Sequence, residues 1–210
     1  MKYADNKKIR AFVDACHRVA DFGLLRCSSG NMSCRLNYKL AVLTASGAWL
    51  GEITARQAAI CRIDNGQCIN GLTPTVENKF HLGILRKRPD VSVVLHFQSP
   101  FATAIACGKP NDYNFNVISE VPYYIKDPAV VKYLPPGSVA LADAVIAAIG
   151  EHDMAILRNH GLVTVGRDFN DAIQKACFFE LACQILLCQD NPQFLSKSVI
   201  DELIRNSSKL

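Results

Sequence analysis

Residues 75–98 read TVENKFHLGILRKRPDVSVVLHFQ, and this stretch predicts a helix that leads into a buried strand. The first half places apolar side chains at helical spacing from Phe80 to Leu85, whereas the second half is a short run rich in valine. The segment RKRPD separates the halves, because Pro89 cannot continue a helix and disfavours the helical conformation at Arg88. We expect the rest of the chain to be organised around this helix and strand.

Four polar side chains of this stretch fall on shared faces of the predicted elements. Glu77 and His81 are four residues apart, a spacing that puts both side chains on one face of a helix. His96 and Gln98 are two residues apart at the end of the strand, so their side chains leave the same face of an extended chain. A helix with a carboxylate that feeds a strand ending in an imidazole is suited to form one wall of a metal site.

A second histidine, far along the chain, has a similar setting. Residues 154–157 (MAIL) predict a buried strand, and Asn159-His160-Gly161 follow shortly after it. A single histidine at a strand end is usually an ordinary surface or core residue, but two in similar settings favour a shared site. Catalytic zinc sites use about three protein ligands and leave one position open. His96, His160 and a nearby Glu or Gln would meet that requirement.

Composition limits the class of protein and its partners. With 210 residues, half of them hydrophobic, the chain is long enough for one well-buried core, so we expect a single domain over residues 1–210. The 23 basic and 19 acidic residues are spread along the sequence, and the dense basic cluster, Arg86 to Arg88, lies at a predicted helix end that favours cations. The absence of a basic stripe predicts no nucleic-acid partner.

The cysteines and the hydropathy pattern indicate the compartment. The nine cysteines contain no C-x-x-C pair, and several lie within apolar periodic stretches, so we predict reduced thiols in a cytoplasmic protein. The N-terminal residues MKYADNKKIR lack an apolar signal core. No run approaches the ~18 apolar residues of a membrane span, so no membrane partner is expected.

Two loops of small residues have the composition of anion sites. Residues 26–33 (RCSSGNMS) and 44–47 (TASG) each combine glycine with serine or threonine. Glycine lets the backbone approach a ligand closely, and the NH and hydroxyl groups can then bind an anion. Either loop taken alone has the composition of an ordinary turn.

The remaining sequence predicts helices that alternate with β-hairpins. After a first helix that starts at Asp5 or Asn6 and ends near Gly23, helices are expected at residues 101–107, 138–149, 168–188 and 196–204. Strands are expected at residues 33–36, 38–44, 57–64, 67–70, 153–157 and 162–165, with an Asn65-Gly66 hairpin turn. Residues 111–136 predict irregular structure with short strands. This order predicts an α/β fold with three α/β/α layers and a mixed, largely antiparallel central sheet.

The ordered motifs resemble a known family. With Gly30-Asn31-Met32-Ser33, Thr44-Ala45-Ser46-Gly47, Glu77 through His96 and Asn159-His160-Gly161 in this order, the chain resembles the class II aldolase and adducin family over nearly its whole length. The resemblance implies a three-layer fold assembled as a fourfold-symmetric homotetramer, with a Zn²⁺ site close to a subunit boundary.

The resemblance also implies a reaction and a role for each matching residue. His96 and His160 match zinc-binding histidines, and Glu77 matches the acid that accepts and donates a proton near the metal. The residues that match phosphate-binding positions are Gly30, Asn31, Ser46, Gly47 and Thr75. The implied activity is that of a metal-dependent aldehyde-lyase of carbohydrate metabolism. Its substrate would be a ketose 1-phosphate such as L-fuculose 1-phosphate, cleaved to dihydroxyacetone phosphate and an aldehyde.

Three departures from the family pattern leave alternatives open. The family usually has His-x-His where this chain has His96-Phe97-Gln98. Either Gln98 is a weak third ligand, Glu77 takes a larger share of the metal binding, or the metal site is impaired. Val76 stands where a second phosphate-binding hydroxyl is expected. A C-terminal phenol is absent, and Tyr123 or Tyr124 could serve on the aldehyde side instead. Similar proteins include sugar-phosphate epimerases and dehydratases, and adducin-like members that bind without catalysis.

Overall fold

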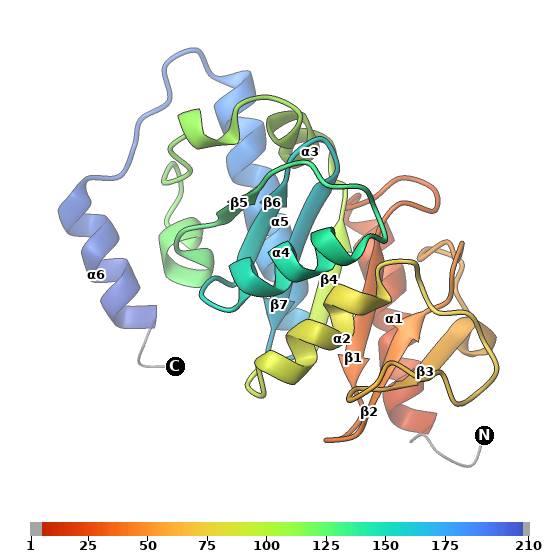
Figure 1. Cartoon of the computed structure of the whole chain (residues 1–210). Helices are drawn as coiled ribbons and strands as arrows, with labels where there is room; N and C mark the ends of the chain where they lie inside the picture. The colour runs from red at the N-terminus through yellow and green to blue at the C-terminus, as the bar shows by residue number, and fades with distance from the viewer. Residues whose placement is uncertain (1–5, 208–210) are drawn as a thin grey trace.

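Seven strands form one mixed sheet at the centre of the computed structural model, which describes residues 6–207 (Figure 1). The strand order is β3-β2-β1-β4-β7-β6-β5, and every neighbouring pair is antiparallel except β5 and β6. The strands are β1 (Asn31–Arg35), β2 (Leu40–Thr44), β3 (Ala58–Arg62), β4 (Val93–Phe97), β5 (Ala129–Val131), β6 (Met154–Leu157) and β7 (Gly161–Gly166).

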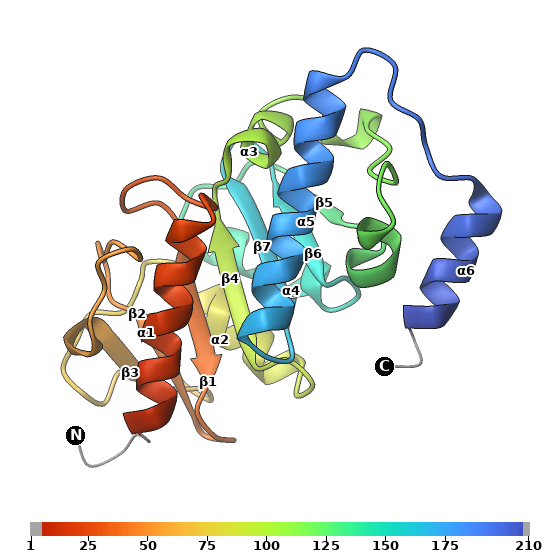
Figure 2. The ribbon, with the colours of Figure 1, turned by 180° about the vertical axis from the view of Figure 1, so that it is seen from behind.

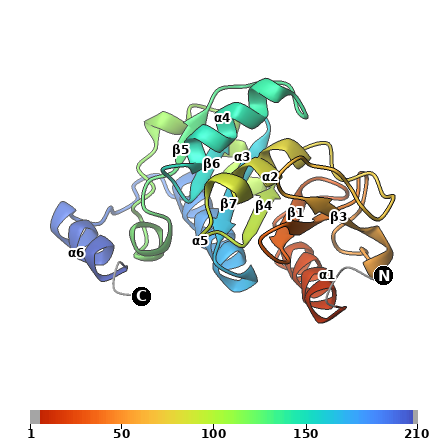
Figure 3. The ribbon, with the colours of Figure 1, turned by 60° about the horizontal axis from the view of Figure 1, so that its bottom comes forward.

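Helices cover both faces of the sheet. The helices are α1 (Asn6–Asp21), α2 (Asn78–Lys87), α3 (Pro100–Ala106), α4 (Val139–Ile149), α5 (Phe169–Cys188) and α6 (Lys197–Ser207). Seen from behind, α1, α3 and α5 lie in front of the sheet (Figure 2). Figure 3 shows α2 and α4 on one side of the strands and α1 and α5 on the other. The predicted three-layer α/β/α class with a mixed, largely antiparallel sheet is therefore confirmed.

The alternation of side chains along β4 divides the core and directs His96. Val93, Leu95 and Phe97 pack into the hydrophobic cluster beneath α1, α3 and α5. Val94 packs into the cluster beneath α2 and α4. Because successive residues of a strand point to opposite faces, His96 points toward α2.

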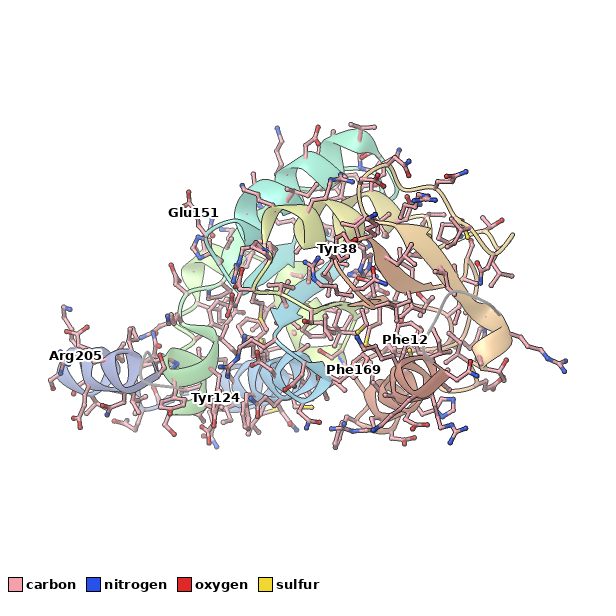
Figure 4. The ribbon with its side chains drawn as sticks, turned by 90° about the horizontal axis from the view of Figure 1, so that it is seen from below. Phe12, Tyr38, Tyr124, Glu151, Phe169 and Arg205 are labelled. Carbon is pink, nitrogen blue, oxygen red and sulfur yellow. The ribbon has the colours of Figure 1, made fainter. Side chains whose placement is uncertain are left out.

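The layer of α1 and α5 is joined by aromatic side chains. The rings of Phe12 and Phe169 have centroids 6.5 Å apart, and Figure 4 shows both side chains between the two helices. Phe12 is fully buried. The inner face of α5 is buried, with Phe179 and Ala182 among its fully covered side chains.

The segment 67–70, predicted as a strand, forms a single β-bridge between Cys61 and Cys68 instead. The cause lies in Asn70, whose side-chain amide accepts from Ile60 N at 3.1 Å and donates to Ala58 O at 2.9 Å. The Asn70 side chain therefore takes the hydrogen-bonding groups of β3 that the backbone of a partner strand would use, so regular strand pairing ends here.

Residues 111–136 contain more helical structure than predicted. Besides β5, this part of the chain has one π-helical turn (Val121–Ile125), and a 3-10 turn (Pro110–Asp112) overlaps its start. A π-turn has no 3.6-residue period by which a sequence pattern would reveal it. A further 3-10 turn (Ala55–Gln57) precedes β3.

The C-terminal helix lies apart from the central sheet, whereas α1 packs against it. Asp5, one of two residues predicted to cap the first helix, lies outside the described residues, and α1 begins at Asn6. Helix α6 stands beside the π-turn at the end of a long connection, and none of its residues is buried (Figure 1). Within residues 6–207, no helix combines the length and the apolar character needed to cross a lipid bilayer.

Candidate functional site

Glu77 lies at the N-cap of α2, with only 4% of the residue exposed. The backbone NH of Gly137 donates to Glu77 Oε1 at 3.2 Å, from the loop between β5 and α4. Burial raises the pKa of Glu77 above its ordinary value, and the hydrogen bond from Gly137 opposes that rise. A buried carboxyl group with a raised pKa is suited to both accept and donate a proton near neutral pH.

His96 is held so that one ring nitrogen is available to a ligand. Its Nδ1 lies 2.9 Å from the carbonyl oxygen of Leu162, which can only accept, so Nδ1–H is the donor and Nε2 carries the free lone pair. Burial, reinforced by the nearby His160, lowers the pKa of His96 to about 3, and the hydrogen bond to Leu162 opposes that shift. The imidazole is therefore neutral near neutral pH, which is the form that binds metals.

His160 occupies the last position of the three-residue loop that joins β6 to β7. Its backbone NH donates to Leu157 O at 3.1 Å, and Asn159 has φ of 55°, a left-handed conformation that asparagine tolerates. The ring centroids of His160 and His96 are 4.8 Å apart, and His160 Nε2 lies 3.9 Å from Glu77 Oε1. Burial lowers the pKa of His160. The three predicted residues Glu77, His96 and His160 therefore converge, although they come from three distant segments.

The donor atoms at this point fit a divalent cation. His160 Nδ1 is buried without a hydrogen-bond partner, and His96 Nε2 is left free for a ligand. The Gln98 amide nitrogen donates to His160 O at 2.6 Å, so Oε1 is the Gln98 atom left to bind a metal. Among the described residues 6–207, no three His, Cys, Asp or Glu side chains form a metal cluster by themselves. A cation here would thus rely on two imidazoles and on an additional ligand such as the Gln98 amide oxygen.

The first small-residue loop lies directly against His96. Asn31 begins β1 and is the cross-strand partner of His96. Gly30 has φ of 82°, and a Cβ on it would lie 2.8 Å from the His96 carbonyl oxygen. Only glycine fits both the positive φ and this close approach, which explains the Gly-Asn pair.

The second loop is joined to the first through the end of β2. Ser46 N donates to Thr73 O and Thr75 N donates to Thr44 O, both at 2.9 Å. Thr44 Oγ1 in turn accepts a hydrogen bond from the backbone NH of Met32, at 3.4 Å. The predicted phosphate-binding residues therefore come from three adjacent segments, with Ser46 and Gly47 exposed and Thr75 buried.

His81 is a site residue to which the sequence assigned no role. It is fully buried one helical turn after Glu77. Its Nε2 lies 2.5 Å from Asn31 Oδ1, and its Nδ1 lies 2.8 Å from Ser33 Oγ. Burial, reinforced by His96, lowers the pKa of His81 to about 3. The signal was present in the two-residue spacing of Asn31 and Ser33, which puts both on the strand face toward α2.

Tyr123 and Tyr124 are not brought to this site within one chain. Both lie in the π-turn and line a cavity of about 180 Å³ together with Asp153 and Lys175. That cavity is at the start of β6 and the end of β7, whereas His160 lies at the opposite ends of these strands. Tyr124 stacks on Phe178 of α5 at a centroid distance of 5.3 Å.

Known proteins are similar to this chain in sequence and in fold. The sequence profile of the Class II Aldolase and Adducin N-terminal domain family matches residues 10–187. An L-fuculose phosphate aldolase of Methanococcus maripaludis (strain C5 / ATCC BAA-1333) is 31% identical over 181 residues, which are 86% of this chain and 96% of the relative. A 3-oxo-tetronate 4-phosphate decarboxylase of Haemophilus influenzae is 29% identical over 147 residues, which are 69% of this chain and 70% of the relative.

A solved structure extends the likeness to the whole fold. The structure of YgbL from Klebsiella pneumoniae superimposes with a TM-score of 0.87 and 23% identity, covering 95% of this chain and 99% of that one. The two sequence relatives are thus named as an aldolase and a decarboxylase, and structural similarity supports the fold.

Proposed function

The chain belongs to the class II aldolase and adducin family, and from this premise we propose that it is a zinc-dependent aldolase. The proposed reaction cleaves a ketose 1-phosphate, L-fuculose 1-phosphate or a close analogue, to dihydroxyacetone phosphate and an aldehyde. The observation that carries the proposal is the convergence of Glu77, His96 and His160 beside the Gly30-Asn31 loop.

We assign the metal to His96, His160 and the amide oxygen of Gln98, with Glu77 at its edge. When bound, zinc would supply a Lewis acid that stabilises the negative charge of an enediolate. Gln98 offers a neutral oxygen, which is a poorer ligand for zinc than imidazole. We therefore expect weaker metal affinity than a site with a third histidine would have.

We assign the phosphate to the two small-residue loops. The residues that would hold it are Gly30, Asn31, Ser46, Gly47 and Thr75. Val76, 60% exposed, stands where the family pattern has another hydroxyl donor. Losing one neutral hydrogen bond costs about 0.5–1.5 kcal/mol, a factor of roughly ten at most, so phosphate binding would be weakened but retained.

Glu77 would act as the proton donor and acceptor. The hydroxyl group beside the scissile carbon–carbon bond loses its proton to a base, the bond breaks to release the aldehyde, and the electron pair of the bond remains on the enediolate of dihydroxyacetone phosphate. Glu77 then donates a proton to the enediolate carbon and accepts one in the reverse direction. Burial raises its pKa and so favours the protonated form, whereas the hydrogen bond from the Gly137 NH favours the ionised form.

Decarboxylation is the second candidate, favoured by the similarity to the Haemophilus influenzae decarboxylase. Loss of carbon dioxide from a 3-oxo-tetronate 4-phosphate leaves the same enediolate, so the same acid and the same loops would serve. Epimerase and dehydratase activities remain further readings of this site. A non-catalytic, adducin-like binding protein is the alternative that Gln98 keeps open.

We further propose that residues 1–210 act as one domain and assemble into a homotetramer in the cytoplasm. All nine cysteines are free thiols, which suits a reducing compartment. Exposed apolar side chains near the C-terminus, such as Phe194 and Val199, suit an interface between subunits.

Two measurements test the enzyme assignment. Purified protein should contain zinc, and His160→Ala should lose most of it, whereas His152→Ala, at the far end of β6, should not. Wild type supplied with excess metal should cleave at least one member of a panel of ketose 1-phosphates. Glu77→Gln should lower kcat by about 10²–10⁴-fold, while Glu151→Gln, at an exposed turn, should not change it.

Gln98 separates an active enzyme from a binding protein. In an enzyme, Gln98→His should tighten zinc binding and leave the cleavage rate within about tenfold of wild type. A wild type that is inert on the ketose 1-phosphates, and on a 3-oxo-tetronate 4-phosphate, would rule out both lyase readings. Turnover of the sugar acid alone would select the decarboxylase.

A further inference from the structure

His81 has a hydrogen-bond partner on each ring nitrogen, although it lies in an otherwise apolar part of α2. Asn31 Oδ1 is 2.5 Å from Nε2, and Ser33 Oγ is 2.8 Å from Nδ1. An amide oxygen can only accept, so Nε2–H is the donor, and the neutral ring then has its lone pair on Nδ1, where Ser33 donates. One tautomer satisfies both contacts.

This tautomer fixes the orientation of the Asn31 amide. Because Oδ1 is turned toward His81 and α2, the NH₂ end is the part left to bind a ligand. The opposite rotation would present an oxygen lone pair, which repels an anion. The backbone of Asn31 is held as well, since it pairs across the strands with His96.

We propose that His81 is a positioning residue of the anion site, which holds the Asn31 amide so that its NH₂ group donates to the phosphate of the substrate. The inference rests on the proposed function, because it presumes that an anion binds at Asn31. His81 itself does not touch the anion, and it acts through Asn31. Ser33 pairs with the other ring nitrogen, and its hydroxyl group can do so as donor or acceptor, so the contact with Asn31 does not depend on it.

The position of His81 in α2 argues for a role beyond packing. Its neighbours Phe80, Leu82, Ile84 and Leu85 are all buried apolar residues. Burying a polar ring among them is unfavourable unless its nitrogens are paired. Packing alone would be served by another apolar side chain.

The first test examines the free protein by NMR. Long-range proton–nitrogen correlations should show His81 with its proton on Nε2, and the Asn31 side-chain amide should give one pair of dispersed resonances. A His81 proton on Nδ1 would mean that Asn31 turns its oxygen to the loop, and this result would overturn the proposal. This measurement involves no phosphate, so it is independent of the proposed function.

The second test titrates inorganic phosphate into the protein and follows the Asn31 amide and competitive inhibition. His81→Phe keeps a ring but no donor, and it should weaken phosphate binding about tenfold, the effect of one misdirected hydrogen bond. His81→Gln retains an amide donor near the Nε2 position and should restore affinity to within about threefold of wild type. The KM of the sugar phosphate should rise with the phosphate dissociation constant, while kcat changes little, because Glu77 is untouched.

Ser33→Ala is the matched control. It removes the other partner of His81, so it should lower thermal stability like His81→Phe but leave phosphate affinity near that of wild type. Equal phosphate affinity in wild type and His81→Phe would overturn the role of His81 while leaving the anion site intact. If the Asn31 amide resonances of the wild type do not shift when phosphate is added, the proposed anion site is refuted, and the role of His81 is refuted with it.

Discussion

Gly161 lets the β6–β7 hairpin approach the end of strand β4 closely. A Cβ at this position would lie 2.7 Å from both Phe97 O and Gln98 Cγ, and 3.2 Å from His96 Cε1. A backbone oxygen cannot move aside as a flexible side chain can. The distance between the two imidazoles is therefore set by the absence of a side chain at residue 161.

We predict that Gly161→Ala displaces the hairpin and carries His160 away from His96. Zinc content should fall, and kcat/KM should drop by about 100-fold, the typical effect of a misplacement of 1 Å in an active site. Metal analysis and the cleavage assay measure this. Gly108→Ala is the control, because a Cβ there makes ordinary contacts, the shortest at 3.5 Å to Ile105 O. Equal losses in both variants would contradict the prediction.

Acid should destabilise the protein through its buried imidazoles. Above pH 6.5 His81 is neutral in both the folded and the unfolded chain. As the pH falls toward 3, the unfolded ring takes up a proton and the folded ring does not, so the free energy of unfolding falls by about 1.4 kcal/mol per pH unit for one such group. His81→Gln should make this slope shallower by that amount in denaturant titrations between pH 6 and 4. An unchanged slope would show that the folded imidazole is protonated there.

Sequence patterns indicated the candidate site residues but not the side chains with which those residues form hydrogen bonds. Glu77, His96 and His160 could be found because each lies where a predicted element begins or ends, and the structure brings them together. Tyr123 and Tyr124 were selected by residue type alone, and the fold places them at the other end of the sheet. Hydrogen bonds such as those of His81 depend on tertiary contact, which spacing does not encode.

At the scale of elements, α3 begins at a carboxylate supplied by another helix. Glu180 of α5 accepts from Ser99 Oγ at 2.6 Å and from the backbone NH groups of Phe101 and Ala102 at 3.0 and 2.8 Å. These NH groups have no partner within α3, and a negative charge suits the helix N-terminus. Glu180 therefore joins α3 and α5 just after the Gln98 segment.

We predict that Glu180→Gln lowers the free energy of unfolding by about 1–3 kcal/mol, since it removes the charge from three hydrogen bonds. Chemical denaturation measures the loss. Glu202→Gln, on the exposed side of α6, is the control and should have little effect. A Glu180→Gln variant as stable as wild type would show that the carboxylate is not a significant cap.

Elements were predictable where a local signal decides them and not where side chains override the backbone. Pro89 separates a helix from a strand as expected, and α2 ends at Lys87. The predicted 67–70 strand does not form, because the Asn70 side chain makes the hydrogen bonds that its backbone would otherwise make. The π-turn has no periodic sequence pattern by which it could be predicted. In both cases, tertiary contacts determine the conformation of a short segment, and these contacts cannot be predicted from local sequence.

At the scale of the whole molecule, the C-terminal part of the chain leaves apolar side chains uncovered. Leu181, Leu187, Phe194 and Val199 are each 41–48% exposed, and α6 has no buried residue. Gathered into one patch, such side chains would form an interaction surface. A second copy of the chain is the partner that the family resemblance implies.

We predict a native mass of four times the 23.1-kDa chain mass in size-exclusion chromatography with light scattering. Val199→Asp should shift the population toward smaller species, because a charge cannot be buried at an apolar interface without a large penalty. Arg205→Ser, also on α6, is the control and should keep the wild-type mass (Figure 4). A monomeric wild type at micromolar concentration would contradict the assembly.

The junction of Gly30, Asn31 and His96 has a consequence for how such proteins change their substrates in evolution. One short stretch of paired backbone holds both the proposed anion loop and an imidazole, so we expect a substitution at either strand to disturb both. Residues 30, 31, 33, 81 and 96 should covary as a set among homologues. Mutant libraries that aim at new sugars should keep this set constant and vary exposed positions such as Trp49 and Val76 instead.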